Sequence, residues 1–136
     1  MKYLFFGLLG LLALAVLGRI VDPGDAQPVT AERLATDMRA QVALPKDMGD
    51  GLRLDQIAAS GNDIVFTATM TDTAPGQYPA EAVATLEQVS LSDACRNLSA
   101  TARTLMNKHG IAVVKEFRDA AGGIVIRQRI TPAQCQ

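Results

Sequence analysis

The sequence contains no tryptophan, and beyond its N-terminal segment only Phe66, Tyr78 and Phe117 are aromatic. Aromatic platforms on which bases or sugars stack are therefore not expected. Positive charge is not in excess either, because 13 basic residues stand against 14 acidic ones and the formal net charge is −1. A protein that neutralises nucleic-acid phosphates needs a basic surface. These shortages exclude nucleic acid as an expected partner and leave aliphatic residues and alanine to fill the core.

Residue types that carry catalysis or bind metals are equally scarce. His109 is the only histidine, and it stands at the predicted end of a helix just before Gly110, where a cation complements the helix dipole. No second histidine or unpaired cysteine is available to join it in a metal site. The chain also lacks the Gly-x-Ser-x-Gly pattern of a nucleophile on a strand–turn–helix. We therefore expect no catalytic residue, no metal, no cofactor and no enzymatic activity.

What the sequence does contain, at its start, is an apolar run between two basic residues. Lys2 precedes it, residues 3–18 carry no charge, Arg19 follows, and the first acidic residue is Asp22. A basic residue before a leucine-rich stretch is typical of a membrane-targeting segment. We expect residues 1–21 to form a membrane-targeting helix and to place the rest of the chain in the periplasm.

This run has two interpretations, a retained anchor and a cleaved signal. At about 16 residues it is short for a membrane span of roughly 20, unless Ile20 and Val21 extend it past an Arg19 that snorkels to the interface. Residues 24–26 offer small side chains to a signal peptidase, with cleavage before Gln27. We favour an uncleaved anchor that tethers the domain to the inner membrane, and a soluble periplasmic domain is the alternative.

Behind the anchor the sequence predicts a linker and one small domain. Residues 22–29 hold prolines, a glycine and aspartates, as a linker does. Residues 30–136 suffice for a single modest core. Two cysteines in an exported domain usually pair. We therefore expect a disulfide between Cys95 and Cys135, which would stabilise the fold by roughly 3–4 kcal/mol.

The first half of the domain predicts a helix and a hairpin. Leu34 and Met38 share one helical face, and the helix is expected from Ala31 to about Val42, with Thr30 as its N-cap. The remaining assignments follow from turn residues and alternation. They are a turn at 46–51, a strand from 52 with a register change near 57, a turn at 60–63, and a strand at 64–71.

The second half predicts two helices and a second hairpin. Helical periodicity runs from Ala80 to near Cys95 and again over 100–109, and alternation predicts strands at 111–119 and 124–131. This order indicates an α+β fold, a small antiparallel sheet of two β-hairpins with the helices packed on one face. The disulfide would tie the end of the last strand to the middle helix.

Two polar clusters are weaker candidates. Asp47 and Asp50 flank Gly49 and are interpreted as a polar turn, with weak cation binding as the alternative. The last hairpin is predicted to expose a mildly basic face, interpreted as solvated strand surface, with docking of an acidic partner as the alternative. The residues of this basic face are Lys115, Arg118, Arg127 and Arg129.

Several segments of the second half occur in an order known from one family. They are residues 92–95, a helix ending at 108–110, the strand 111–119, Gly123, and residues 130–135. This order resembles the disulfide-bonded, AspS-like pilotins of type II secretion. The resemblance implies a periplasmic module that binds an amphipathic helix of a secretin and escorts it to the outer membrane, a helix-in-groove mode. Those pilotins carry a lipidated cysteine at the mature N-terminus, whereas this leader has no cysteine.

Two hypotheses about function follow. The first is a non-enzymatic, periplasm-facing binding or accessory module, pilotin-like, which docks to a membrane or secretion-system partner. The alternative is a structural accessory subunit of an inner-membrane protein complex, in which the anchor itself packs on other helices through its small residues. Both hypotheses expect a protein partner and contact with the membrane through the N-terminal segment.

Overall fold

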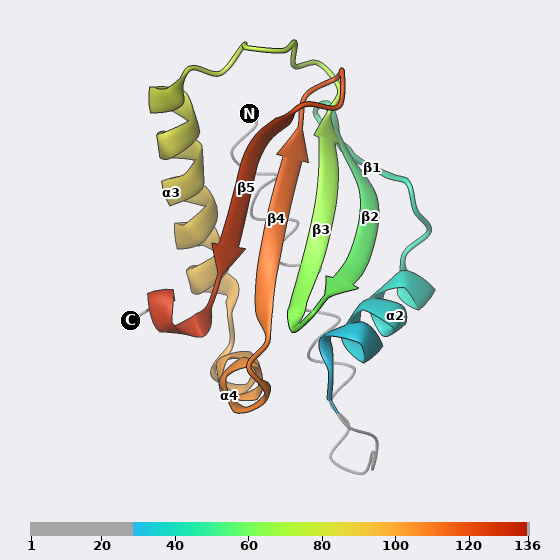
Figure 1. Cartoon of the computed structure of the whole chain (residues 1–136), viewed down its shortest axis with the longest axis vertical. Coiled ribbons are helices and arrows are strands. Elements are labelled where there is room, and N and C mark those ends of the chain that lie inside the picture. The colour runs from blue at the N-terminus through green and yellow to red at the C-terminus, as the bar shows by residue number, and fades with distance from the viewer. Residues whose placement is uncertain (1–28, 136) are drawn as a thin grey trace.

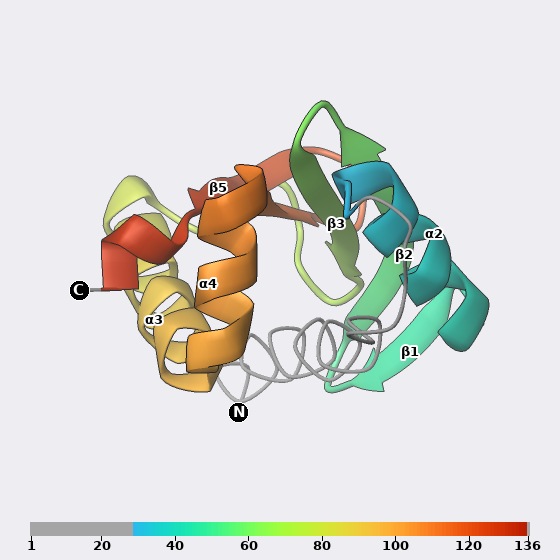
Figure 2. The ribbon, with the colours of Figure 1, turned by 90° about the horizontal axis from the view of Figure 1, so that it is seen from below.

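The computed structural model describes residues 29–135 of the chain. A five-stranded sheet with the order β1-β2-β3-β4-β5 carries the helices (Figures 1 and 2). In chain order the elements are α2 (Ala31–Gln41), β1 (Lys46–Gly49), β2 (Leu52–Ser60), β3 (Asp63–Met70), α3 (Ala80–Asn97), α4 (Ala100–His109), β4 (Ala112–Arg118), β5 (Ile124–Ile130) and the 3-10 helix η1 (Pro132–Cys135). Among residues 29–135 no helix has the length and apolar character needed to cross a membrane. The predicted membrane-targeting helix, residues 1–21, lies outside the described residues.

The three helices lie where the sequence predicted them, because each has local signals at its ends. α2 begins after Thr30, whose Oγ1 accepts a backbone hydrogen bond of 3.1 Å. α3 stops at Leu98, which is extended, and Ser99 then caps α4 in the same way as Thr30 caps α2. α4 ends at Gly110, whose φ of 65° is the left-handed conformation that glycine adopts without strain.

The sheet is mixed, which corrects the prediction of an antiparallel sheet. β1–β2, β2–β3 and β4–β5 are antiparallel pairs, whereas β3 and β4 run parallel. The chain leaves β3, passes through α3 and α4, and enters β4 in the same direction. A parallel pair needs a long crossover of this kind. Each hairpin was predicted from local alternation, but alternation does not say how two hairpins join.

Residues 46–49 form the edge strand β1, where the sequence predicted only a turn. Its register places Lys46 opposite Leu54. The turn is tighter than predicted and occupies residues 49–51, all with positive φ. Four residues without a β-branched side chain carry no local strand signal, so pairing with β2 creates this strand. The register change predicted in β2 is present, just before Gln56.

The strand register sorts the side chains into two faces. One row of the inner face runs through Leu54, Ala68, Phe117 and Ile126, and every member is buried. Leu34 of α2 and Leu86 of α3 belong to the same apolar core as this row. α2 and α3 therefore pack on one face of the sheet (Figure 2). The alternate positions of the strands, which face outward, include Arg53, Thr67, Glu116 and Arg127.

Candidate functional site: the inner face of the sheet

The inner face has two unlike halves, and α2 covers the first. The buried residues of α2 are Ala31, Leu34, Ala35 and Met38, and they pack against apolar residues of β2 and β3. At the edge of this contact the Arg39 guanidinium donates a 2.8 Å hydrogen bond to the Ile57 carbonyl oxygen. This half is a conventional apolar helix–sheet contact.

The second half, under α3, is partly polar. The inner row that follows the apolar one contains Ile57, Phe66, Lys115 and Gln128, so it changes character between β3 and β4. The buried residues that α3 sets against the sheet are Leu86, Ser90 and Ala94. We call the contact of Ser90 and the Glu87 carbonyl with Lys115 and Gln128 the α3 seam.

Lys115 is the central residue of the α3 seam. Only 3% of it is exposed, and its Nζ donates a 3.4 Å hydrogen bond to Ser90 Oγ. Burial lowers the pKa of Lys115 from 10.5 to about 8, while the charge of Asp93 acts in the opposite direction. Gln128 Nε2 donates to the Glu87 carbonyl oxygen at 2.9 Å. The seam therefore holds α3 with polar contacts more than with apolar packing.

The C-terminal end of α3 is held covalently. Cys95 and Cys135 form a disulfide with their Cα atoms 5.1 Å apart, joining α3 to η1. The Arg103 guanidinium donates a 2.8 Å hydrogen bond to the Cys95 carbonyl oxygen. This end of α3 is therefore fixed to both η1 and α4, whereas its other end is reached through the loop after β3 (Figure 1).

Several apolar side chains that pack against the core remain partly exposed on the inner side. Four of them lie in four different elements: Met48 of β1, Val83 of α3, Leu105 of α4 and Val113 of β4. A hollow of about 430 Å³ lies beside Leu105 on α4. We call these four residues the inner apolar surface. Apolar side chains that keep contact with water gain from contact with an apolar partner.

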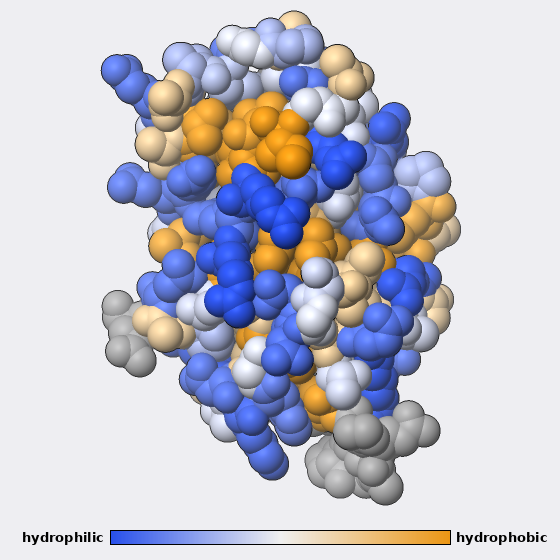
Figure 3. Space-filling model, in the orientation of Figure 1, coloured by the Kyte–Doolittle hydropathy of each residue, from blue (hydrophilic) through white to orange (hydrophobic). Residues whose placement is uncertain are grey.

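The outward face is not the basic surface that the sequence predicted, because Lys115 points inward and the arginines are paired. Glu116, which is 4% exposed, accepts hydrogen bonds from Arg118 at 2.8 Å and from Arg127 at 2.9 Å. Burial alone would raise the pKa of Glu116, but these two arginines lower it below its usual value. Arg129 pairs with Asp63 at 3.2 Å. Figure 3 shows this face, with hydrophilic residues lying between hydrophobic areas.

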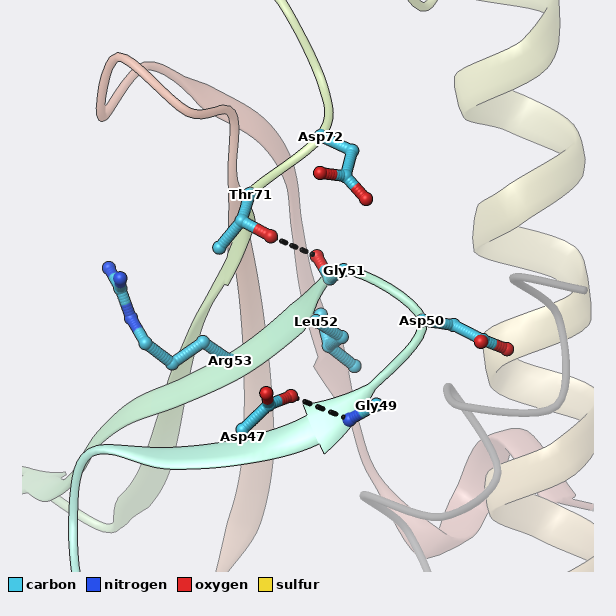
Figure 4. Close-up of a pocket in the computed structure, with 8 residues that line it drawn as sticks. All are labelled: Asp47, Gly49, Asp50, Gly51, Leu52, Arg53, Thr71 and Asp72. Atoms are coloured by element: carbon cyan, nitrogen blue, oxygen red, sulfur yellow. Dashed lines mark hydrogen bonds between the residues drawn. The ribbon is translucent and has the colours of Figure 1, made fainter.

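Asp47 and Asp50 lie at a hollow of about 410 Å³ beside the β1–β2 turn (Figure 4). The Asp47 carboxylate accepts a 2.8 Å hydrogen bond from the Gly49 amide, and the Asp50 side chain points away from Asp47 and Asp72. Within residues 29–135 no three or more metal-ligating side chains are grouped to hold an ion. His109 is the last residue of α4. The geometry favours the polar-turn interpretation of the two aspartates.

Comparison with solved structures shows which known proteins share this fold. No family model and no curated protein matches the sequence. The pilotin EpsS of the Vibrio vulnificus type 2 secretion system aligns with a TM-score of 0.58 and 27% identity, over 78% of this chain and 88% of that one. The type II secretion pilotin AspS of Vibrio cholerae aligns with a TM-score of 0.53 and 22% identity, over 77% and 88%. A Pseudomonas aeruginosa protein aligns with a TM-score of 0.55 and 11% identity, over 78% and 93%.

The chain therefore has a pilotin-like fold, as the order of its segments suggested. The similarity to the EpsS pilotin supports an accessory or binding role. The disulfide expected between Cys95 and Cys135 is present. The α3 seam was not predicted from the sequence. A signal for it existed, because Lys115 occupies an inward position of the strand alternation, between Val113 and Phe117.

Proposed function

We propose that the chain is a pilotin-like accessory module of a secretion system that binds an amphipathic helix of a membrane-associated, secretin-type protein. One observation carries this proposal: two secretion pilotins share the fold over more than three quarters of this chain and most of their own length. Fold alone does not specify a partner, so the proposal also depends on a surface that suits a helix.

The inner apolar surface is the part of the domain that suits such a helix. Val83 and Leu105 come from helices and Met48 and Val113 from strands, and all four are partly exposed beside the core. An amphipathic helix presents apolar side chains at spacings of three and four residues. Laying that stripe against these residues would remove apolar area from water on both partners.

We further propose that the domain faces the periplasm and stays tethered to the inner membrane by residues 1–21, which lie outside the described residues. This tether would distinguish the chain from pilotins with a lipidated N-terminal cysteine, because the leader contains no cysteine. In this arrangement the domain would receive its partner at the inner membrane. A cleaved leader would instead give a diffusing periplasmic protein.

The test is binding of the full-length chain, in detergent micelles, to a fluorescent peptide that contains an amphipathic helix of a type II secretin. Saturable binding is expected. Val83→Glu should weaken it about tenfold, since a charge in an apolar contact costs more than 1.4 kcal/mol. Ala84→Glu is the matched control, because Ala84 is the exposed neighbour on the same helix. No binding by the wild type contradicts the proposal.

The alternative, a structural subunit held through its anchor, differs in which part of the chain is needed. Exchanging residues 1–21 for an unrelated membrane anchor should leave partner association intact if the domain carries the interaction. Loss of association after this exchange, measured by crosslinking in native membranes, would favour the anchor as the interacting part.

A further inference from the structure

The inner apolar surface extends from one end of the sheet to the other. Met48 of β1 comes just before the β1–β2 turn, and the Thr71 amide, directly after β3, donates a 2.7 Å hydrogen bond to the Gly51 carbonyl oxygen of this turn. Leu105 lies on α4, which leads into β4. Because β3 and β4 run parallel, the turn at the end of β3 and the helix at the start of β4 lie at opposite ends of the sheet (Figure 1).

The end of this surface at the β1–β2 turn is acidic. Asp47, Asp50 and Asp72 are exposed and line the hollow of about 410 Å³ beside the turn. Arg53 lines this hollow too, but its guanidinium pairs with Asp55 at 2.6 Å. The Asp50 side chain points towards the side of the turn on which α3 lies (Figure 4). This end therefore favours a partner that brings positive charge.

The opposite end, at α4, is basic. Lys108 is exposed and lines the hollow of about 430 Å³ together with Leu105. Lys108 and His109 are the basic residues of the last turn of α4, and residues 100–109 include no aspartate or glutamate. Within residues 29–135 Lys108 forms no ion pair. A carboxylate on a partner that covers Leu105 can therefore pair with the Lys108 ammonium.

The separation of the two ends sets the length of a helix that reaches both. β3, which runs between them, has 8 residues and therefore extends about 26 Å, at about 3.3 Å per residue. A helix of this length has about 17 residues. The N-terminus of a helix carries a partial positive charge and its C-terminus a partial negative charge. The dipole of such a helix is therefore favoured in one direction along the surface and disfavoured in the other.

We propose that the inner apolar surface binds its partner helix in one direction. The N-terminal end of that helix carries basic side chains and lies at Asp50 and Asp72, and its C-terminal end carries acidic side chains and lies at Lys108. This inference rests on the proposed function and adds the charge pattern and the direction of the partner. Apolar contacts supply most of the affinity, whereas the charges at the two ends discriminate against helices with the wrong pattern.

The test uses the full-length chain in detergent micelles and two synthetic amphipathic helices of about 17 residues, both acetylated and amidated. The two peptides have the same composition and the same apolar stripe. The first peptide has lysines in its first turn and glutamates in its last turn, and in the second each end carries one of both. The wild type should bind the first peptide about tenfold more tightly, because ion pairs at both ends and the helix dipole favour it.

Two variants test whether Lys108 contributes to this preference. Lys108→Gln should reduce the preference to about threefold, because it removes the ion pair at one end. Asn107→Asp is the matched control, since it changes the net charge by the same amount at the exposed neighbouring position, which does not line the hollow. The control should keep the preference of the wild type. An equal reduction in both variants would assign the preference to net charge and overturn the role of Lys108.

A photo-reactive group on the first peptide reports the direction of binding. Placed at the first residue, the group should link to the β1–β2 turn, and placed at the last residue it should link to α4, as mass spectrometry of the linked products can show. The reverse pattern, or equal affinities for the two peptides, overturns this inference. Saturable binding of the secretin helix in the same assay then leaves the proposed function standing. Failure of the secretin helix to bind overturns both.

Discussion

The two ends of the inner face are covered by helices that attach in different ways. α2 sets Leu34 and Met38, both buried completely or nearly so, into an apolar core. α3 sets Leu86 into the same core, but its next buried residue is Ser90, which meets Lys115. The disulfide bond between Cys95 and Cys135 joins α3, and not α2, to another element.

We infer from this difference that α3 is stabilised at its C-terminal end and packs weakly along the rest of its length. Apolar burial holds α2 along most of its contact with the sheet, and its contribution to stability scales with the apolar area buried. The neutral hydrogen bond of Gln128 contributes only about 1 kcal/mol net, and the cost of burying the Lys115 ammonium offsets its hydrogen bond to Ser90. The polar seam therefore adds little to the attachment of α3. Loss of the disulfide should therefore weaken the attachment of α3 more than that of α2. Loss of a buried apolar side chain should cost more stability on α2 than on α3.

The largest effect is expected from the disulfide. Replacing both Cys95 and Cys135 with alanine should lower the free energy of unfolding by about 4 kcal/mol, because the bond closes a long loop in the unfolded chain. The cysteines are 40 residues apart. Urea unfolding of the full-length chain measures the change. A loss below about 1 kcal/mol would mean that α3 is held mainly by packing.

The next effect is expected on the α2 side. Leu34→Ala should cost about 3 kcal/mol, because Leu34 is fully buried and the shortened side chain leaves a cavity. Leu86→Ala on α3 is the matched variant and should cost about 2 kcal/mol, at the low end of the range for this change. Equal losses in urea unfolding would remove the distinction between the two helices.

A smaller change in the free energy of unfolding is expected from a change in pH. The pKa of Lys115 is about 8 in the folded chain, below its usual 10.5. Between these values the unfolded chain binds more protons, so stability should rise with pH, by about 1.5 kcal/mol from pH 8 to 9.5. Unfolding in urea at several pH values measures this rise, and the Lys115→Met variant should lack it. If the stability of the wild type falls between pH 8 and 9.5, Lys115 does not have the lowered pKa that its burial under α3 predicts.

The smallest effect is expected at the start of α2. Thr30→Ala should cost about 1 kcal/mol, because it removes the side-chain acceptor of the first turn. Thr36→Ala, at an exposed position within the same helix, should change stability by less than about 0.5 kcal/mol. Thermal unfolding of both variants tests the cap. Identical melting temperatures would show that packing alone sets where α2 begins.

Much of the fold was predictable because its signals are local. The cap at Thr30, the glycine after α4 and the alternation of both hairpins each lie within a few residues. β1 was not predictable, since its four residues become a strand only by pairing with β2. The prediction of a basic outward face was wrong for a similar reason. Glu116 of β4 pairs with Arg127 of the neighbouring strand β5 and neutralises part of that face, and this pairing is not visible in the sequence.

By itself, the sequence determined the helices, the hairpins and the expectation that its two cysteines pair. Periodicity, caps and an even cysteine count depend only on neighbouring residues or on composition. Only the tertiary structure decided that β3 and β4 run parallel, and that Lys115 lies under α3 against Ser90. Both depend on where the crossover returns the chain. The direction in which the chain re-enters the sheet after α4 depends on how the whole inner face packs. No single segment of the sequence predicts it.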